Sequence, residues 1–127
     1  MRASIPEELL DTIVEKIYLD LEIHILEKKH MYAETQKKDE EHIKFLKQVI
    51  SSVRKKRKEI GEVLKGKNVK IYEVVELDDM FVEYTYAQKT NGASKEGTQR
   101  FWKAGLKYRL TRRINERLTR GVEENTN

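Results

Sequence analysis

The fold of this chain is decided by residues 43–64, whose sequence is IKFLKQVISSVRKKRKEIGEVL. Apolar residues in this stretch recur alternately three and four residues apart, and Arg57 interrupts the series once. A spacing that averages about 3.5 residues keeps one stripe of an α-helix facing a neighbouring helix. The stretch therefore predicts a packing seam of the coiled-coil type, which is also the candidate seam for an oligomer. The seam residues are Ile43, Leu46, Ile50, Val53, Arg57, Ile60 and Leu64.

A first helix is predicted upstream of the seam. Ser4 and Glu7 are spaced to form a capping box, and an apolar stripe follows from Leu10 to Ile25. The apolar surface of this helix extends beyond one face, which is typical of a helix that packs on more than one neighbour. We therefore expect the first helix to lie at the centre of the fold.

The link between the two stripes is polar over residues 28–41. Either one helix continues through the helical region, residues 5–65, or the chain turns near residues 33–40 and forms an antiparallel helical hairpin. The two stripes do not share one heptad frame, so we favour the hairpin.

Apolar residues alternate, instead of following a helical period, after Gly66, which is the expected left-handed helix terminator. Residues 69–77 and 80–87 are rich in β-branched and aromatic residues, and Asp78-Asp79 between them can form a tight turn. We therefore predict a β-hairpin over residues 69–88. Two strands alone are marginal in water, so the hairpin must pack on the helices or pair with strands of another subunit.

The rest of the chain predicts a loop over residues 88–98, a C-terminal helix over 99–120 and a polar tail over 121–127. Asn91-Gly92 is a turn signal inside the loop, and a short third strand could follow it. Together these elements predict an α+β, mainly helical fold in a single domain of residues 1–127. It consists of an N-terminal helical hairpin (or long helix), a β-hairpin and a basic C-terminal helix.

The net charge of +4 conceals a block pattern. Residues 52–71 and 89–127 carry a net charge of +6 each, whereas residues 1–51 and 72–88 carry −3 and −5. The basic blocks can pair with the acidic blocks inside the fold or between subunits. Alternatively, the basic blocks can face a partner that carries phosphates or carboxylates.

The C-terminal helix is the strongest candidate for a binding surface. It contains eight basic residues and one acidic residue between Arg100 and Arg120. An ideal helix places an apolar ridge from Leu106 to Leu118 on one side and arginines on the far side. These arginines can bind phosphate or carboxylate groups, follow a nucleic-acid backbone, or pair with acids of the same chain. The candidate residues are Arg109, Arg112, Arg113 and Arg120.

A second basic cluster occupies residues 54–58 of the seam helix. Five successive residues surround a helix, so they cannot all meet one surface, and a solvated helix face is the simpler interpretation. Similar runs also occur in nuclear-import signals and nucleic-acid patches. Arg54, Lys55 and Lys58 are the candidates to assist the C-terminal helix.

The sequence shows no recognisable catalytic motif. It has no cysteine, no glycine-rich phosphate loop after a strand and no serine placed near a histidine by a local motif. Glu27 with His30, and Asp39 with His42, have the spacing of half a di-metal site, but they lie in the most polar part of the chain. We therefore predict no enzymatic activity, no cofactor and no metal.

These observations favour a non-enzymatic protein-interaction or adaptor module that self-associates through its helical faces, with a homodimer as the favoured oligomer. The alternative is a nucleic-acid-binding protein that uses the basic C-terminal helix. No apolar run has the length of a membrane span, and the N-terminus has no apolar signal core. We therefore expect a cytoplasmic protein with an unidentified protein partner and no membrane contact.

Overall fold

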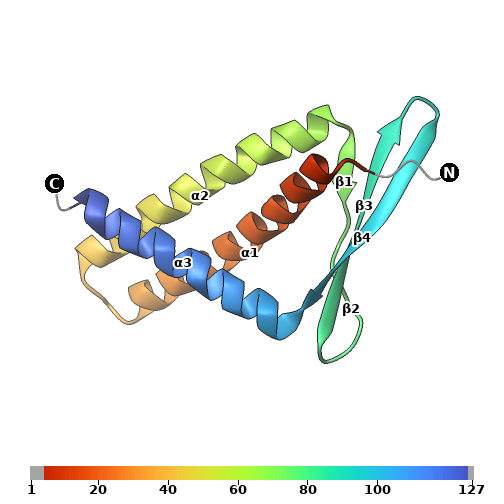
Figure 1. Cartoon of the computed structure of the whole chain (residues 1–127). Coiled ribbons are helices and arrows are strands. Elements are labelled where there is room, and N and C mark those ends of the chain that lie inside the picture. The colour runs from red at the N-terminus through yellow and green to blue at the C-terminus, as the bar shows by residue number, and fades with distance from the viewer. Residues whose placement is uncertain (1–4, 126–127) are drawn as a thin grey trace.

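The chain folds into three long helices and one antiparallel sheet, in a computed structural model that describes residues 5–125, with side chains to residue 120 (Figure 1). The predicted fold class is confirmed, because the structure is α+β and mainly helical. In chain order the elements are α1 (Glu7–Thr35), α2 (Glu40–Gly66), β1 (Val69–Ile71), β2 (Val75–Glu76), β3 (Phe81–Thr90), β4 (Ala93–Trp102) and α3 (Lys103–Asn125).

The helical region is a hairpin and not one continuous helix. After α1 the chain turns at Lys37, which adopts a left-handed conformation with φ of 51°. Asp39 then caps α2 by accepting a hydrogen bond from the backbone N–H of Glu41 at 3.5 Å. This turn lies within the predicted residues 33–40. The Ser4 member of the predicted capping box lies outside the described residues.

The end of α2 matches the prediction in position but not in conformation. The helix ends at Gly66, whereas the left-handed residue is Asn68, with φ of 59°. Asparagine adopts this conformation more readily than most residues because its short polar side chain can hydrogen-bond locally. The chain therefore enters β1 directly after an asparagine turn.

β3 is the central strand of the sheet. β1 and β2 pair with successive parts of one edge of β3, and β4 pairs with the other edge along its whole length. The predicted hairpin of residues 69–88 is therefore confirmed, with its first strand interrupted between β1 and β2. Asp78 closes its turn by accepting hydrogen bonds from the backbone N–H groups of Met80 at 2.7 Å and Phe81 at 2.9 Å.

The loop predicted over residues 88–98 is wrong, because most of this segment is strand. β3 runs to Thr90, Asn91-Gly92 forms a two-residue turn with Gly92 at φ of 73°, and β4 follows. The last residues of β4 still pair with β3, so α3 begins at Lys103 and not at residue 99. α3 continues to Asn125, past the predicted start of the tail.

The core has two parts, and α1 contributes to both. Near the sheet, Ile17 and Tyr18 of α1 pack against Val82, Tyr86 and Phe101, and the rings of Tyr18 and Phe101 meet edge to face at 5.9 Å. Between the helices, a second cluster combines α1, α2 and α3 residues: Leu19, Ile23, Leu26, Val49, Ile50, Val53 and Ile114. The central position predicted for the first helix is therefore confirmed.

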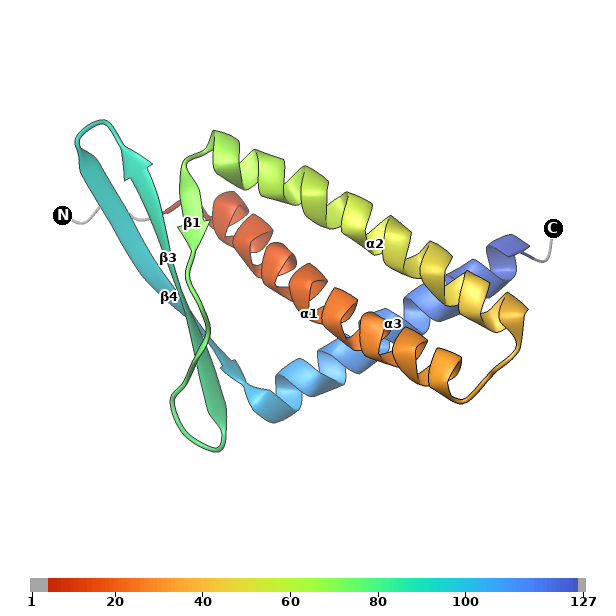
Figure 2. The ribbon, with the colours of Figure 1, turned by 180° about the vertical axis from the view of Figure 1, so that it is seen from behind.

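The sheet stands at one end of the helical layer, beside the start of α1 and the end of α2, and α3 runs obliquely across α1 (Figure 2). Its helix-facing side carries Val82, Tyr86 and Phe101. Because side chains alternate along a strand, the neighbours Phe81 and Trp102 point to the opposite side of the sheet. Among the described residues, no helix is both long and apolar enough to cross a membrane.

Candidate interaction surfaces

The seam of α2 is covered within the chain. Leu46, Ile50, Val53 and Leu64 are buried, and the apolar residues Ile43 and Ile60 are half-buried. The buried residues pack mainly against α1, the antiparallel partner of α2 in the hairpin. Arg57, the charged member of the seam, lies at 3.8 Å from the carboxylate of Asp20 on α1. The seam thus holds the helical hairpin together.

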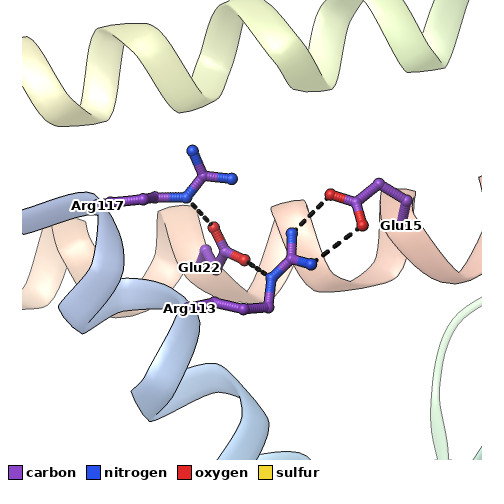
Figure 3. Close-up of polar contacts among 4 residues, drawn as sticks. All are labelled: Glu15, Glu22, Arg113 and Arg117. Atoms are coloured by element: carbon purple, nitrogen blue, oxygen red, sulfur yellow. Dashed lines mark hydrogen bonds and ion pairs between the residues drawn. The ribbon is translucent and has the colours of Figure 1, made fainter. Parts of the chain in front are cut away.

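Arg113 faces the interior, so its predicted place on the outer side of the C-terminal helix is wrong. Its guanidinium donates hydrogen bonds to both oxygens of Glu15, at 2.6 and 3.0 Å, and to Glu22 (Figure 3). Arg117 donates to the other oxygen of Glu22 at 2.5 Å. Two arginines of α3 therefore share one carboxylate of α1.

Glu22 is the buried centre of this network, with no solvent exposure. It needs both guanidinium groups, because a buried carboxylate is costly unless it is paired and hydrogen-bonded. Burial by itself disfavours the charge of Arg113, but hydrogen bonds and charges from Glu15 and Glu22 outweigh burial and raise its pKa. The same guanidinium lies 5.0 Å from the ring centre of Tyr18.

Glu15, Glu22 and Arg117 were not among the residues predicted from the sequence. One signal was available, because Glu22 lies among Leu19, Ile23 and Leu26, the residues that extend the apolar surface of the first helix beyond its stripe. An acidic residue in an apolar stripe indicates a partner of opposite charge. Its partners lie 91 and 95 residues away along the chain, too far for local spacing to identify them.

Three of the candidate arginines on α3 remain exposed. Arg109, Arg112 and Arg120 have no acidic partner among the described residues. Arg112 lies over the ring of the exposed Tyr108 at 5.8 Å. Glu116 is on the same side and lines a shallow depression of about 430 Å³ with Arg112 and Arg120. The outward charge of α3 is therefore smaller than its composition suggests.

The second basic cluster is also divided. Arg54 pairs with Glu27 of α1 at 2.5 Å. Lys55 and Lys58 are exposed and have no acidic partner among residues 5–120. Arg54 therefore stabilises the helical hairpin, and of the three candidates only Lys55 and Lys58 are left to contact an external partner.

An exposed apolar surface lies at the end of the sheet where β2, the β2–β3 turn and the last residue of β4 meet, with the Trp102 ring against Gly105 of α3. We call it the sheet patch and define it as the exposed residues Val75, Leu77, Met80 and Trp102 together with the half-buried Phe81. Phe81 and Trp102 are partners in the β3–β4 pairing, and the backbone N–H of Leu77 donates to the carbonyl of Phe81 at 3.0 Å. Trp102 is 55% exposed and Val75 is also 55% exposed. The sequence predicted Val75, Leu77, Met80 and Phe81 as strand residues, placed Trp102 in the C-terminal helix, and did not predict a surface.

The sheet patch has an acidic border and a fixed shape. Glu83 lies opposite Val75 in the sheet, and Asp78 and Asp79 form the adjoining turn. Asp78 accepts hydrogen bonds from two backbone N–H groups, and these bonds lower the pKa of its carboxyl. The positive charges of Lys103 and Arg100 lower it further by smaller amounts. The carboxylate therefore holds the turn that presents Met80.

The two pairs with the spacing of half a di-metal site, Glu27 with His30 and Asp39 with His42, do not form a metal site within residues 5–125. His30 Nδ1 lies 2.9 Å from Glu34, whereas Glu27 pairs with Arg54. Within residues 5–125, no group of three or more histidine or acidic side chains has the arrangement of a metal site.

A protein-family model described as YhjD protein matches residues 4–121, so this chain belongs to the YhjD protein family. No curated protein and no solved structure matches the chain.

Proposed function

We propose that this member of the YhjD protein family is a non-enzymatic protein-interaction module that binds a partner protein through the sheet patch. The observation that carries the proposal is the gathering of large apolar side chains, including the single tryptophan of the chain, outside the core. Contiguous exposed apolar patches are uncommon on soluble monomers and mark interaction sites. Tryptophan is also among the residues that contribute most to binding energy in interfaces.

The border of the patch indicates the chemistry of the partner. Glu83, Asp78 and Asp79 surround apolar side chains, and the acidic block of residues 72–88 contains no basic residue. Complementary charges at the rim of an interface favour the correct partner and speed its association. We therefore expect a partner with an apolar contact surface bordered by lysine or arginine.

Site-specific photo-crosslinking in the cells that produce the protein tests this proposal. A photoreactive amino acid replaces Val75 in the patch, and Val63 on α2, which is 51% exposed, provides the matched control. We expect one protein adduct that forms from position 75 and not from position 63. The variant Met80→Ser should reduce it, because Met80 is an exposed member of the patch. Identical adducts from the two positions, or none from position 75, would contradict the proposal.

Nucleic-acid binding by α3 is the second candidate, favoured by one observation. Arg109, Arg112 and Arg120 are exposed and lack acidic partners among the described residues. If they contact phosphates, replacing all three by Gln should weaken DNA or RNA binding and lower the salt dependence of log K by about one for each lost contact. Arg113 stays unchanged, because it stabilises the fold. Failure of the unmodified protein to bind either polymer at low salt would eliminate this candidate.

A further inference from the structure

β4 presents a free edge on the side of the strand that faces away from β3. The strand has ten residues, and each of them pairs with a residue of β3, from Phe81 with Trp102 to Thr90 with Ala93. Among residues 5–125, no backbone hydrogen bond joins the opposite edge of β4 to another segment. A free edge of this length offers a row of unpaired N–H and C=O groups to another strand.

Two of the features that usually block such an edge, a proline and a bulge, are absent from β4, although the strand carries the charged residues Lys95, Glu96 and Arg100. The strand contains no proline, and its one-to-one pairing with β3 leaves no bulge. Figure 1 and Figure 2 show that α3 leaves the sheet at the end of β4, so that the helix does not run along the free edge. The edge is therefore open to a second strand.

The charges on β4 match those of a second, antiparallel β4. Phe101 packs into the core, so Ser94, Glu96, Thr98, Arg100 and Trp102 share the opposite face of the strand. Two identical strands that pair around a two-fold axis at Thr98 place Glu96 of each copy opposite Arg100 of the other. Opposite charges in directly facing positions stabilise a strand pair.

The neighbouring registers lack this match. An axis at Glu96 or at Arg100 places like charges opposite each other, which is destabilising. An axis at Gly97 or Gln99 leaves both Glu96 and Arg100 opposite uncharged residues. One register is therefore selected by the charges of the strand itself.

We propose that two copies of this chain associate through the free edges of β4, antiparallel and with Thr98 at the two-fold axis, to form one continuous eight-stranded sheet. Self-association then uses the sheet, and the apolar seam of α2 stays inside each copy. The proposal goes beyond the proposed function and does not depend on it, because four of the five residues of the sheet patch lie in β2, the β2–β3 turn and the start of β3. Only Trp102 lies in β4.

Charge reversal at the two facing positions tests the register. Glu96→Arg alone places arginines opposite each other at both ends of the pair, and Arg100→Glu alone places glutamates there. We expect each variant alone to dimerise about tenfold more weakly than the unmodified chain in sedimentation equilibrium, because two attractive pairs become repulsive. An equimolar mixture of the two variants should recover the affinity, since every facing pair is then of opposite charge. Circular dichroism confirms that each variant is folded.

A disulfide provides an independent measurement, because the chain contains no cysteine. Under mild oxidation, Thr98→Cys should form a covalent dimer, since its two copies face each other at the axis. Ser94→Cys lies on the same face of β4, but its copies are roughly 26 Å apart in this register, at about 3.3 Å per residue, and should not link. A monomer at all concentrations, equal linking by the two variants, or a mixture that fails to recover dimerisation would overturn the proposal.

Discussion

The buried carboxylate of Glu22 should be worth several kilocalories per mole to the fold, and Glu22→Gln tests this. The substitution keeps the size of the side chain but leaves Arg117 without a carboxylate and Arg113 with Glu15 only. Removing one partner of a fully buried ion pair costs about 3–5 kcal/mol. The side chains of Arg113 and Arg117 are 28% and 18% exposed, so water can partly replace the lost partner. We therefore expect the lower end, about 3 kcal/mol.

This loss can be expressed as a shift of the melting temperature. A 127-residue chain unfolds with an entropy of about 2.1 cal/mol/K per residue, or roughly 0.27 kcal/mol/K in total. A loss of about 3 kcal/mol then lowers the melting temperature by about 11 °C. Thermal unfolding followed by circular dichroism measures the shift, and urea titration with an unchanged slope confirms that the free energy of unfolding has changed.

Two further variants separate the buried charge from other effects. Glu27→Gln removes the exposed pair with Arg54 and should cost less than about 1 kcal/mol. Replacing Glu22, Arg113 and Arg117 together by Met removes the charges but keeps much of the volume, and should restore most of the stability. The reasoning fails if Glu22→Gln costs no more than Glu27→Gln. It also fails if the triple variant is as unstable as Glu22→Gln, because lost packing would then explain the cost.

Three further outcomes are expected. Gly97→Ala should lower stability by about 1–3 kcal/mol in urea unfolding, because a Cβ there would lie 2.6 Å from the hydroxyl of the buried residue Tyr86. Gly66→Ala, with open space around it, is the control and should not destabilise. The lowered pKa of Asp78 means that its stabilising effect is present above the ordinary value of 3.8 and is lost as the pH falls through the lowered pKa. NMR titration should therefore give a carboxyl midpoint below 3.8, and a midpoint at or above it would contradict the hydrogen bonding of the turn. Burial raises the pKa of Tyr84 above 10.0, so its contribution to stability is complete below pH 10 and is lost as the pH rises through the raised pKa. Between pH 9 and pH 11, the free energy of unfolding should fall less for Tyr84→Phe than for the unmodified chain. Equal falls in the two proteins would exclude this explanation.

The helical hairpin could be predicted because its information is local. Two apolar stripes with incompatible heptad frames require two helices, and the polar residues between them permit a turn. β4 could not be predicted in the same way, because residues 93–100 are polar on both faces and include Gly97. Their extended conformation depends on pairing with β3. Gly97 resembles a loop residue in sequence, yet it is needed in the strand because the Tyr86 ring covers it.

The candidate site was only partly predictable for a geometric reason. Arg113 lies three residues after Leu110, which is about 60° from it around a helix, at the border between the buried and exposed sides. The helical period alone does not determine whether a side chain at this border points toward the core or toward the solvent. The buried carboxylate of Glu22 decides it, because the cost of leaving this carboxylate unpaired exceeds the benefit of exposing an arginine.

The division of the arginines on α3 bears on the choice between the two proposed functions. Arg113 and Arg117 are bound to Glu15 and Glu22, so a nucleic acid could use only the exposed positive charges of this helix, with Glu116 among them. Nucleic-acid affinity grows with the number of phosphates neutralised, and three or four contacts give weak, salt-sensitive binding. Apolar burial is largely independent of salt, and the sheet patch offers it at a surface whose acidic border repels phosphate. The exposed surfaces of the fold therefore favour the proposal of a protein partner over that of a nucleic acid.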